Sequence, residues 1–173
     1  GRLVASHTRQ AALEQVKTEW VAFLDDDDWF YPQHLDVLVA AQLATGADYV
    51  YSWYDVIGGI DPLPHFGKEF DHCAPHQTTI TTLVRTELAQ AATFTTPLGH
   101  SAPPTAGGWI APPDGNRGGE DWFFTLKCVD LGAYIYHTPY RTWAWEHHGA
   151  NTSGLPERWA PARKSFQKNR TGR

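Results

Sequence analysis

Four consecutive carboxylates, Asp25 to Asp28, are the residues whose type and spacing most directly suggest chemistry. They follow a short apolar run, Val21 to Leu24, which is typical of a buried strand. Adjacent negative charges repel one another unless a cation lies among them, and hard divalent cations prefer oxygen ligands. Ligands of open α/β sheets bind beyond the carboxyl ends of the strands. The run therefore indicates either a cation site for a nucleotide diphosphate or a solvated acidic turn, in which Asp28 favours the dipole of the next helix.

Two further polar clusters lie at the ends of expected elements. Glu120 and Asp121 begin an amphipathic segment, and His147, His148 and Asn151 fall in a polar turn. If the clusters converge, a cation would offset charge on a leaving diphosphate, and a separate carboxylate would take the proton of an attacking hydroxyl. Such a site suits transfer of a group from an activated phosphate ester. Taken singly, each cluster also fits helix-terminal acids or a solvated turn.

Helical and β-prone segments alternate along the chain. We expect helices at residues 1–19, 32–45, 86–92 and 120–131, and strands at residues 20–24, 48–55, 78–84, 133–137 and 140–146, with Pro139 separating the last two. Gly46 is expected to cap the second helix. Two long loops, 57–77 and 93–119, are rich in proline and glycine. The alternation of helix and strand predicts a parallel α/β sheet.

The composition is that of an ordinary globular domain, with 173 residues, 42% hydrophobic and 19% charged. The net charge of −5 argues against broad nucleic-acid binding. No apolar run approaches the roughly 20 residues that span a bilayer, and the two cysteines, Cys73 and Cys128, form no motif, so we expect a cytoplasmic protein with free thiols. The chain has no methionine, even at position 1, which indicates a fragment or a processed chain.

Several motifs together resemble the family 2 glycosyltransferases of the GT-A fold. Residues 21–29 with Pro32 resemble the family's D-x-D segment, and residues 119–122, followed by a helix, resemble its second acidic motif. Residues 140–141 and 148–153 look like its closing segment, and residues 8–10 resemble the Ala-Arg-Asn segment before the D-x-D strand. The match is specific because all the motifs stand in the family's order.

The resemblance implies a Rossmann-like, mixed but mainly parallel sheet flanked by helices, and an inverting transferase that uses Mn²⁺ or Mg²⁺. Its donor would be a nucleotide-diphosphate sugar, and its acceptor a carbohydrate or another hydroxyl compound. The implied roles are a general base (Asp121), metal ligands (Asp25, Asp27, His148), donor contacts (Arg9, Asp25, Asp26, Asp27) and acceptor contacts (Glu120, Trp122, Trp109, Asn151).

Members of this family usually begin with further strands that build the nucleobase pocket, and these precede the D-x-D strand. We therefore expect a partial catalytic domain over residues 1–154 and a basic tail over 155–173. An exposed sheet edge would favour a homo-oligomer. Two alternatives stay open: a binding module that retains the fold without turnover, and a metal-dependent nucleotidyltransferase or phosphoesterase that uses the same acids.

Overall fold

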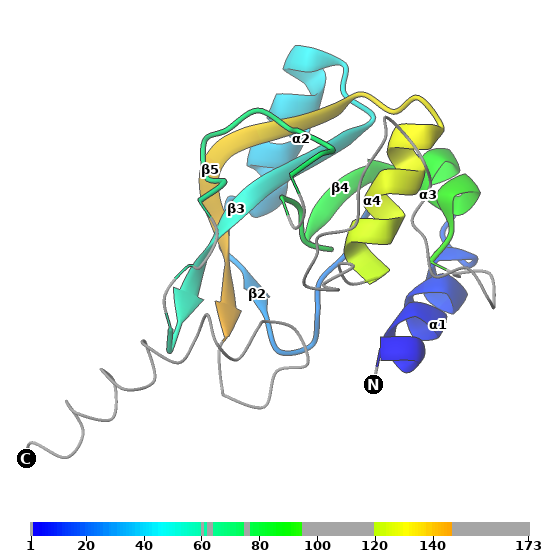
Figure 1. Ribbon diagram of the computed structural model, residues 1–173, viewed down its shortest axis with the longest axis horizontal. Coiled ribbons are helices and arrows are strands. Elements are labelled where there is room, and N and C mark those ends of the chain that lie inside the picture. The colour runs from blue at the N-terminus through cyan, green and yellow to red at the C-terminus, as the bar shows by residue number, and fades with distance from the viewer. Residues whose placement is uncertain (1, 60, 62–63, 75–76, 95–119, 147–173) are drawn as a thin grey trace, which may run out of the picture.

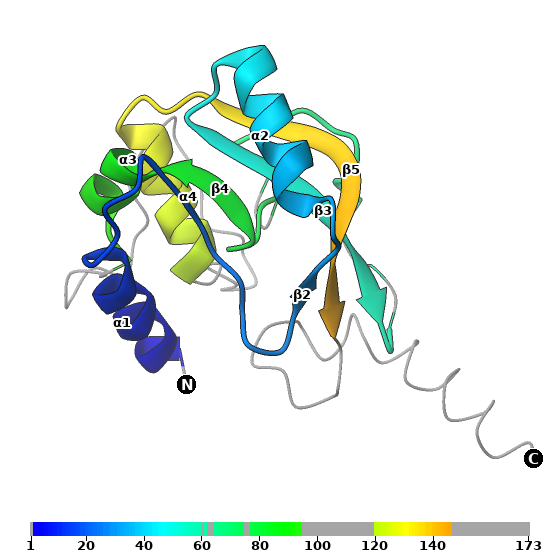
Figure 2. The ribbon, with the colours of Figure 1, turned by 180° about the vertical axis from the view of Figure 1, so that it is seen from behind.

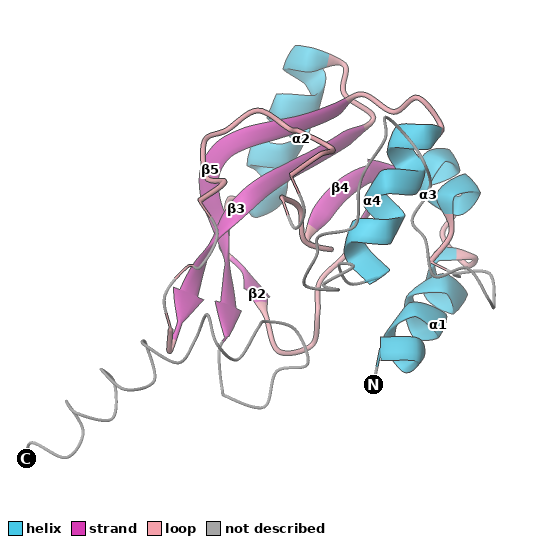
Figure 3. Ribbon diagram, in the orientation of Figure 1, coloured by secondary structure: helices cyan, strands magenta, loops and turns pink. Residues whose placement is uncertain are grey.

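The computed structural model describes residues 2–59, 61, 64–74, 77–94 and 120–146, which form one mixed sheet with helices on both faces (Figure 1, Figure 3). The elements, in chain order, are α1 (Arg2–Leu13), β1 (Trp20–Ala22), β2 (Trp29–Phe30), α2 (His34–Thr45), β3 (Tyr49–Ile57), β4 (Thr82–Arg85), α3 (Thr86–Ala92), α4 (Glu120–Asp130) and β5 (Ile135–Glu146). Within these ranges, no helix combines the length and the apolar character needed to cross a membrane.

The sheet has the strand order β1-β4-β3-β5-β2. The expected mixed α/β fold is confirmed, but the expectation that the sheet is mainly parallel is wrong for the described strands. Only β3 and β5 pair in parallel, whereas the other three pairings are antiparallel. β1, β3 and β5 do run in one direction, as the alternation predicts. β4 runs against them because the described part of the connection after β3 contains no helix, so that β4 returns between β1 and β3 as an antiparallel neighbour.

β3 is buried on both faces and organises the core. Its side chains alternate, so that Tyr49 and Tyr51 join a cluster that includes Phe124 of α4, whereas Val50 joins Leu38 of α2. Figure 1 and its reverse view, Figure 2, show α2 on one face of the sheet and α4 on the other. The aromatic content of this strand is therefore largely a matter of core packing.

β5 is continuous where the sequence predicts two strands. Its pairing with β3 passes from Tyr51 opposite His137 to Trp53 opposite Arg141, so the register shifts around Pro139. Proline has no N–H to give to the ladder, and an irregularity accommodates it without ending the strand. The end of β5 also pairs with β2, a two-residue strand that the sequence analysis did not predict.

Candidate active site

The four acids fold into a tight turn directly after β1. The N–H of Asp28 donates to the carbonyl of Asp25 at 3.2 Å, which closes the turn. Asp25, Asp27 and Asp28 can each offer one carboxylate oxygen, and these atoms lie within 4.8 Å of one another. The turn thus brings together two predicted metal ligands and adds Asp28, whereas Asp26 is exposed and outside this group. The N–H of Glu146 donates to Asp28 at 3.2 Å and joins the turn to the end of β5.

The charge of this turn is only partly compensated. Burial, together with the neighbouring carboxylates of Asp27, Asp25 and Asp26, raises the pKa of Asp28 to about 7, although the hydrogen bond from Glu146 lowers it. At neutral pH the Asp28 carboxyl group is therefore protonated in part of the molecules, and a cation bound here would displace that proton. A donor set of carboxylate oxygens suits Mg²⁺ or Mn²⁺, so the described residues fit the expected metal.

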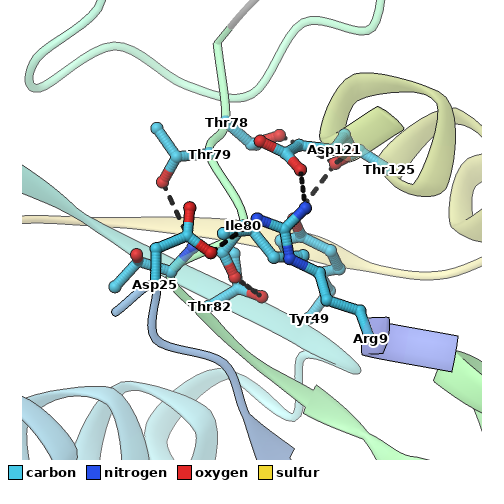
Figure 4. A network of polar contacts seen from close by, with 10 residues as sticks. Arg9, Asp25, Tyr49, Thr78, Thr79, Ile80, Thr82, Asp121 and Thr125 are labelled. Carbon is cyan, nitrogen blue, oxygen red and sulfur yellow. Dashed lines mark hydrogen bonds and ion pairs between the residues drawn. The ribbon is translucent and has the colours of Figure 1, made fainter. Parts of the chain in front are cut away.

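Arg9 connects this turn to the second acidic motif. Its guanidinium forms ion pairs with Asp25 and, at 2.9 Å, with Asp121, which lies 112 residues away in the sequence (Figure 4). The Arg9 side chain is only 15% exposed. Its planar fork suits two carboxylates at once, which a lysine ammonium would satisfy less well. The candidate base and a candidate metal ligand therefore share one cation.

The position of Arg9 follows from how α1 is seated. Leu13 at the end of α1 is fully buried in the core. The side-chain amide of Gln90 on α3 donates to the carbonyls of Leu13 and Val16, at 3.1 Å and 3.3 Å. Gln10 accepts a hydrogen bond from the N–H of Phe94 at 2.8 Å. These contacts fix α1 against α3 and hold Arg9 over the site.

The position of Asp121 depends on a cluster of buried hydroxyls. Thr125, one turn further along α4, donates to the carbonyl of Asp121 at 3.0 Å. The same hydroxyl oxygen lies 3.1 Å from the Tyr49 hydroxyl and 2.7 Å from the Thr78 hydroxyl. A threonine hydroxyl has one proton, so Tyr49 and Thr78 must both donate to it. The cluster ties the start of α4 to β3 and to the segment before β4 (Figure 4).

Sequence reasoning did not find this support. The spacing of four residues between Asp121 and Thr125 could have suggested a bond within one helix. Nothing local connects Thr125 to Thr78 or Tyr49, which come from other parts of the chain. The pairing of Arg9 with Asp121 was missed for the same reason, since Arg9 was predicted only to contact the donor.

The predicted acceptor contacts do not all lie at the site that Arg9 and the acidic turn form. Trp122 is 1% exposed, and its ring lies 6.3 Å from that of Phe70, so in this structure it packs in the interior. Glu120 is the first residue of α4. Two further predicted acceptor contacts, Trp109 and Asn151, lie outside the described residues, as does the predicted metal ligand His148.

Sequence comparison identifies the family. Residues 5–101, which include Arg9, the acidic turn and β1 to α3, match the family described as Glycosyl transferase family 2. The chain belongs to glycosyltransferase family 2. No curated protein sequence matches the chain.

Solved structures agree with this fold. The chain resembles S. aureus TarS 1-349 with a TM-score of 0.58 and 21% identity, over 82% of this chain and 40% of that one. It resembles the complex of the same TarS fragment with UDP-GlcNAc at a TM-score of 0.60 and 18% identity, over 85% and 41%. It also resembles S. aureus TarS itself at 0.59 and 18%, over 82% and 24%. This family 2 chain thus spans less than half the length of those proteins.

Proposed function

We propose that this chain carries the acidic part of the active site of an inverting, metal-dependent glycosyltransferase, which moves a sugar from a nucleotide-diphosphate sugar to an acceptor hydroxyl. The observation that carries the proposal is the pair of Arg9 ion pairs, because they bring the D-x-D acid Asp25 and the candidate base Asp121 to one place. The S. aureus TarS complexes with UDP-GlcNAc and UDP make uridine nucleotides the first donors to test.

Each side chain has a distinct part in the proposed reaction. Asp25, Asp27 and Asp28 hold Mn²⁺ or Mg²⁺, which offsets the negative charge of the leaving diphosphate. Asp121 accepts the proton of the acceptor hydroxyl, whose oxygen forms a bond to the anomeric carbon as the bond from that carbon to the diphosphate breaks. Attack from the face opposite the leaving group inverts the anomeric centre. Arg9 holds Asp121 beside the acidic turn, and Asp121 is not part of the proposed ligand set.

Nucleotide binding tests the donor part of the proposal. Thermal unfolding is measured with UDP, GDP, dTDP and CDP, each with Mn²⁺ and with EDTA. A ligand that binds only the folded chain raises the midpoint by mass action. We expect one nucleotide to raise it in the presence of Mn²⁺ only, and Asp27→Asn to remove the shift. Asp36→Asn, which changes an exposed acid on α2, is the control that keeps it. No Mn²⁺-dependent shift with any nucleotide would contradict a donor site on this chain.

Product analysis tests the chemistry. With the nucleotide sugar that binds, Asp121→Asn should lower transfer by roughly 10²–10⁴-fold, the usual contribution of a general base, and leave the nucleotide shift intact. Release of the nucleoside diphosphate supports glycosyl transfer, whereas pyrophosphate would indicate a nucleotidyltransferase. Full activity of Asp121→Asn would remove Asp121 from the mechanism.

A further inference from the structure

A second group of metal-ligating side chains lies on the turn at residues 71–74, apart in sequence from the acidic turn. The N–H of Ala74 donates to the carbonyl of Asp71 at 2.9 Å, and the N–H of Cys73 donates to the Asp71 carboxylate at 2.8 Å. These bonds fold the chain so that Asp71, His72 and Cys73 can each offer a ligand atom within 4.8 Å of the others. Three consecutive residues thus offer a carboxylate, an imidazole and a thiol at one point.

The protein itself holds this turn in position. The side chain of Gln77 is 1% exposed and bonds to both sides of Phe70, with its oxygen accepting from the Asp71 N–H at 2.5 Å and its nitrogen donating to the Glu69 carbonyl at 2.6 Å. Phe70 packs against the ring of Trp122 at 6.3 Å. The backbone that carries the three ligands is therefore anchored before any ion binds, which lowers the entropic cost of binding.

We propose that Asp71, His72 and Cys73 form a surface site for a transition-metal ion of the zinc class. Zinc is bound by thiolate, imidazole and carboxylate at 2.0–2.3 Å, which places neighbouring ligand atoms of a tetrahedron roughly 3.3–3.8 Å apart. The ligand atoms of Asp71, His72 and Cys73 lie within 4.8 Å of one another, so ion binding would draw them closer together. One carboxylate oxygen of Asp71 already accepts from Cys73, so the other is the metal ligand. Asp71 and Cys73 are exposed, which leaves the fourth position to water.

The ligand chemistry separates this site from the acidic turn. Asp25, Asp27 and Asp28 offer oxygen only, which selects hard ions such as Mg²⁺ and Mn²⁺. A thiolate and an imidazole instead select softer ions, and affinity rises from Co²⁺ to Zn²⁺ for a given site of this kind. The zinc-class site is independent of the proposed glycosyl transfer and can be present or absent without affecting that proposal.

Titration of the full chain with Co²⁺, under a phosphine reductant, tests the site directly. A thiolate ligand gives cobalt a charge-transfer absorption that oxygen ligands do not give. Cys128 is the only other cysteine in the chain, and it is fully buried with its pKa raised by burial to about 12, so the signal reports Cys73. We expect the band to saturate at one equivalent of Co²⁺ and to disappear when Zn²⁺ is added. Zn²⁺ should also raise the thermal unfolding midpoint.

Variants identify the ligands. Cys73→Ser should abolish the band and the Zn²⁺-dependent shift, and Asp71→Asn should weaken Co²⁺ binding about tenfold or more. Asp27→Asn, in the acidic turn, should leave the cobalt band and the Co²⁺ concentration that half-saturates it unchanged. Circular dichroism confirms that each variant is folded. The proposal is overturned if wild type gives no band, if Cys73→Ser retains it, or if saturation needs millimolar Co²⁺, which means an adventitious ion only.

Discussion

Arg9 is the residue on which the arrangement of the site depends most. It holds two carboxylates from opposite ends of the described chain, and its side chain is largely buried between them. Two carboxylates brought together without a cation would repel each other. The Arg9 guanidinium therefore stabilises the position of two carboxylates, that of Asp25 in the acidic turn and that of the candidate base Asp121.

Replacement by lysine separates charge from geometry. Arg9→Lys keeps the positive charge, but an ammonium on a flexible stem cannot reproduce a fork that spans two carboxylates. A hydrogen bond to a charged group contributes about 1.5–3 kcal/mol, so we expect transfer activity to fall about tenfold to a hundredfold. The measurement is kcat/KM for the nucleotide sugar identified by the binding experiment.

Arg85 offers a matched control for this prediction. It also contacts two carboxylates, Glu19 at 3.1 Å and Asp48 at 3.3 Å, but the Glu19 side chain is 72% exposed. Exposed ion pairs contribute little, so Arg85→Lys should change kcat/KM by less than about threefold. Equal losses in the two variants would show that Arg9 has no special role in the site.

At the scale of elements, the sequence was informative where the signal is local. The Gly46 cap is confirmed, with the left-handed backbone angle φ of +73° that such a cap requires, and α3 has the predicted bounds. The acidic turn was predicted because its residues are consecutive. The direction of β4 was not predicted, because the order β1-β4-β3 depends on how a long connection returns. The pairing of Asp121 with Arg9, and that of Thr125 with Tyr49 and Thr78, were missed because these partners come from three other segments.

The packing of α2 on the sheet buries a histidine, and this makes the stability of the fold depend on pH. His34 is fully buried at the start of α2, stacked on Phe30 with ring centroids 3.8 Å apart and bonded to Thr142 at 2.7 Å. Burial lowers its pKa from 6.5 to about 4, so the folded chain holds it neutral. As the pH falls, the His34 imidazole of the unfolded chain is protonated before that of the folded chain. The stability that His34 contributes is therefore fully present above pH 6.5 and is lost as the pH falls towards 4.

The variant His34→Phe keeps an aromatic ring beside Phe30 but cannot be protonated. Wild type should lose on the order of 3 kcal/mol more of its unfolding free energy than this variant between pH 6.5 and 4. Urea denaturation at several pH values gives the unfolding free energy of each protein, and its slope against pH is then compared between the two. His7→Phe on the exposed side of α1 is the control and should retain the wild-type slope. The same slope in His34→Phe would mean that His34 does not govern acid stability.

At the scale of the whole molecule, Thr125 links the parts that must stay together for the site to form. Its hydroxyl joins α4, β3 and the segment before β4, and it supports the carbonyl of Asp121. Thr125, Tyr49 and Thr78 are all buried. Loss of the Thr125 hydroxyl would therefore remove the acceptor that the hydroxyls of Tyr49 and Thr78 share.

Thr125→Val removes this hydroxyl without changing the volume of the side chain. Loss of a buried hydrogen-bond partner costs about 1–3 kcal/mol, and two buried hydroxyls lose a shared one here, so we expect stability in urea to fall by about 2 kcal/mol. Thr125→Ser retains the hydroxyl and loses one methyl group, which costs about 1 kcal/mol. Because the link also positions Asp121, Thr125→Val should lower kcat more than Thr125→Ser does, with the Mn²⁺-dependent nucleotide shift unchanged in both. If the serine variant lost as much activity as the valine variant, packing of the methyl group rather than the hydroxyl would be what holds Asp121 in place.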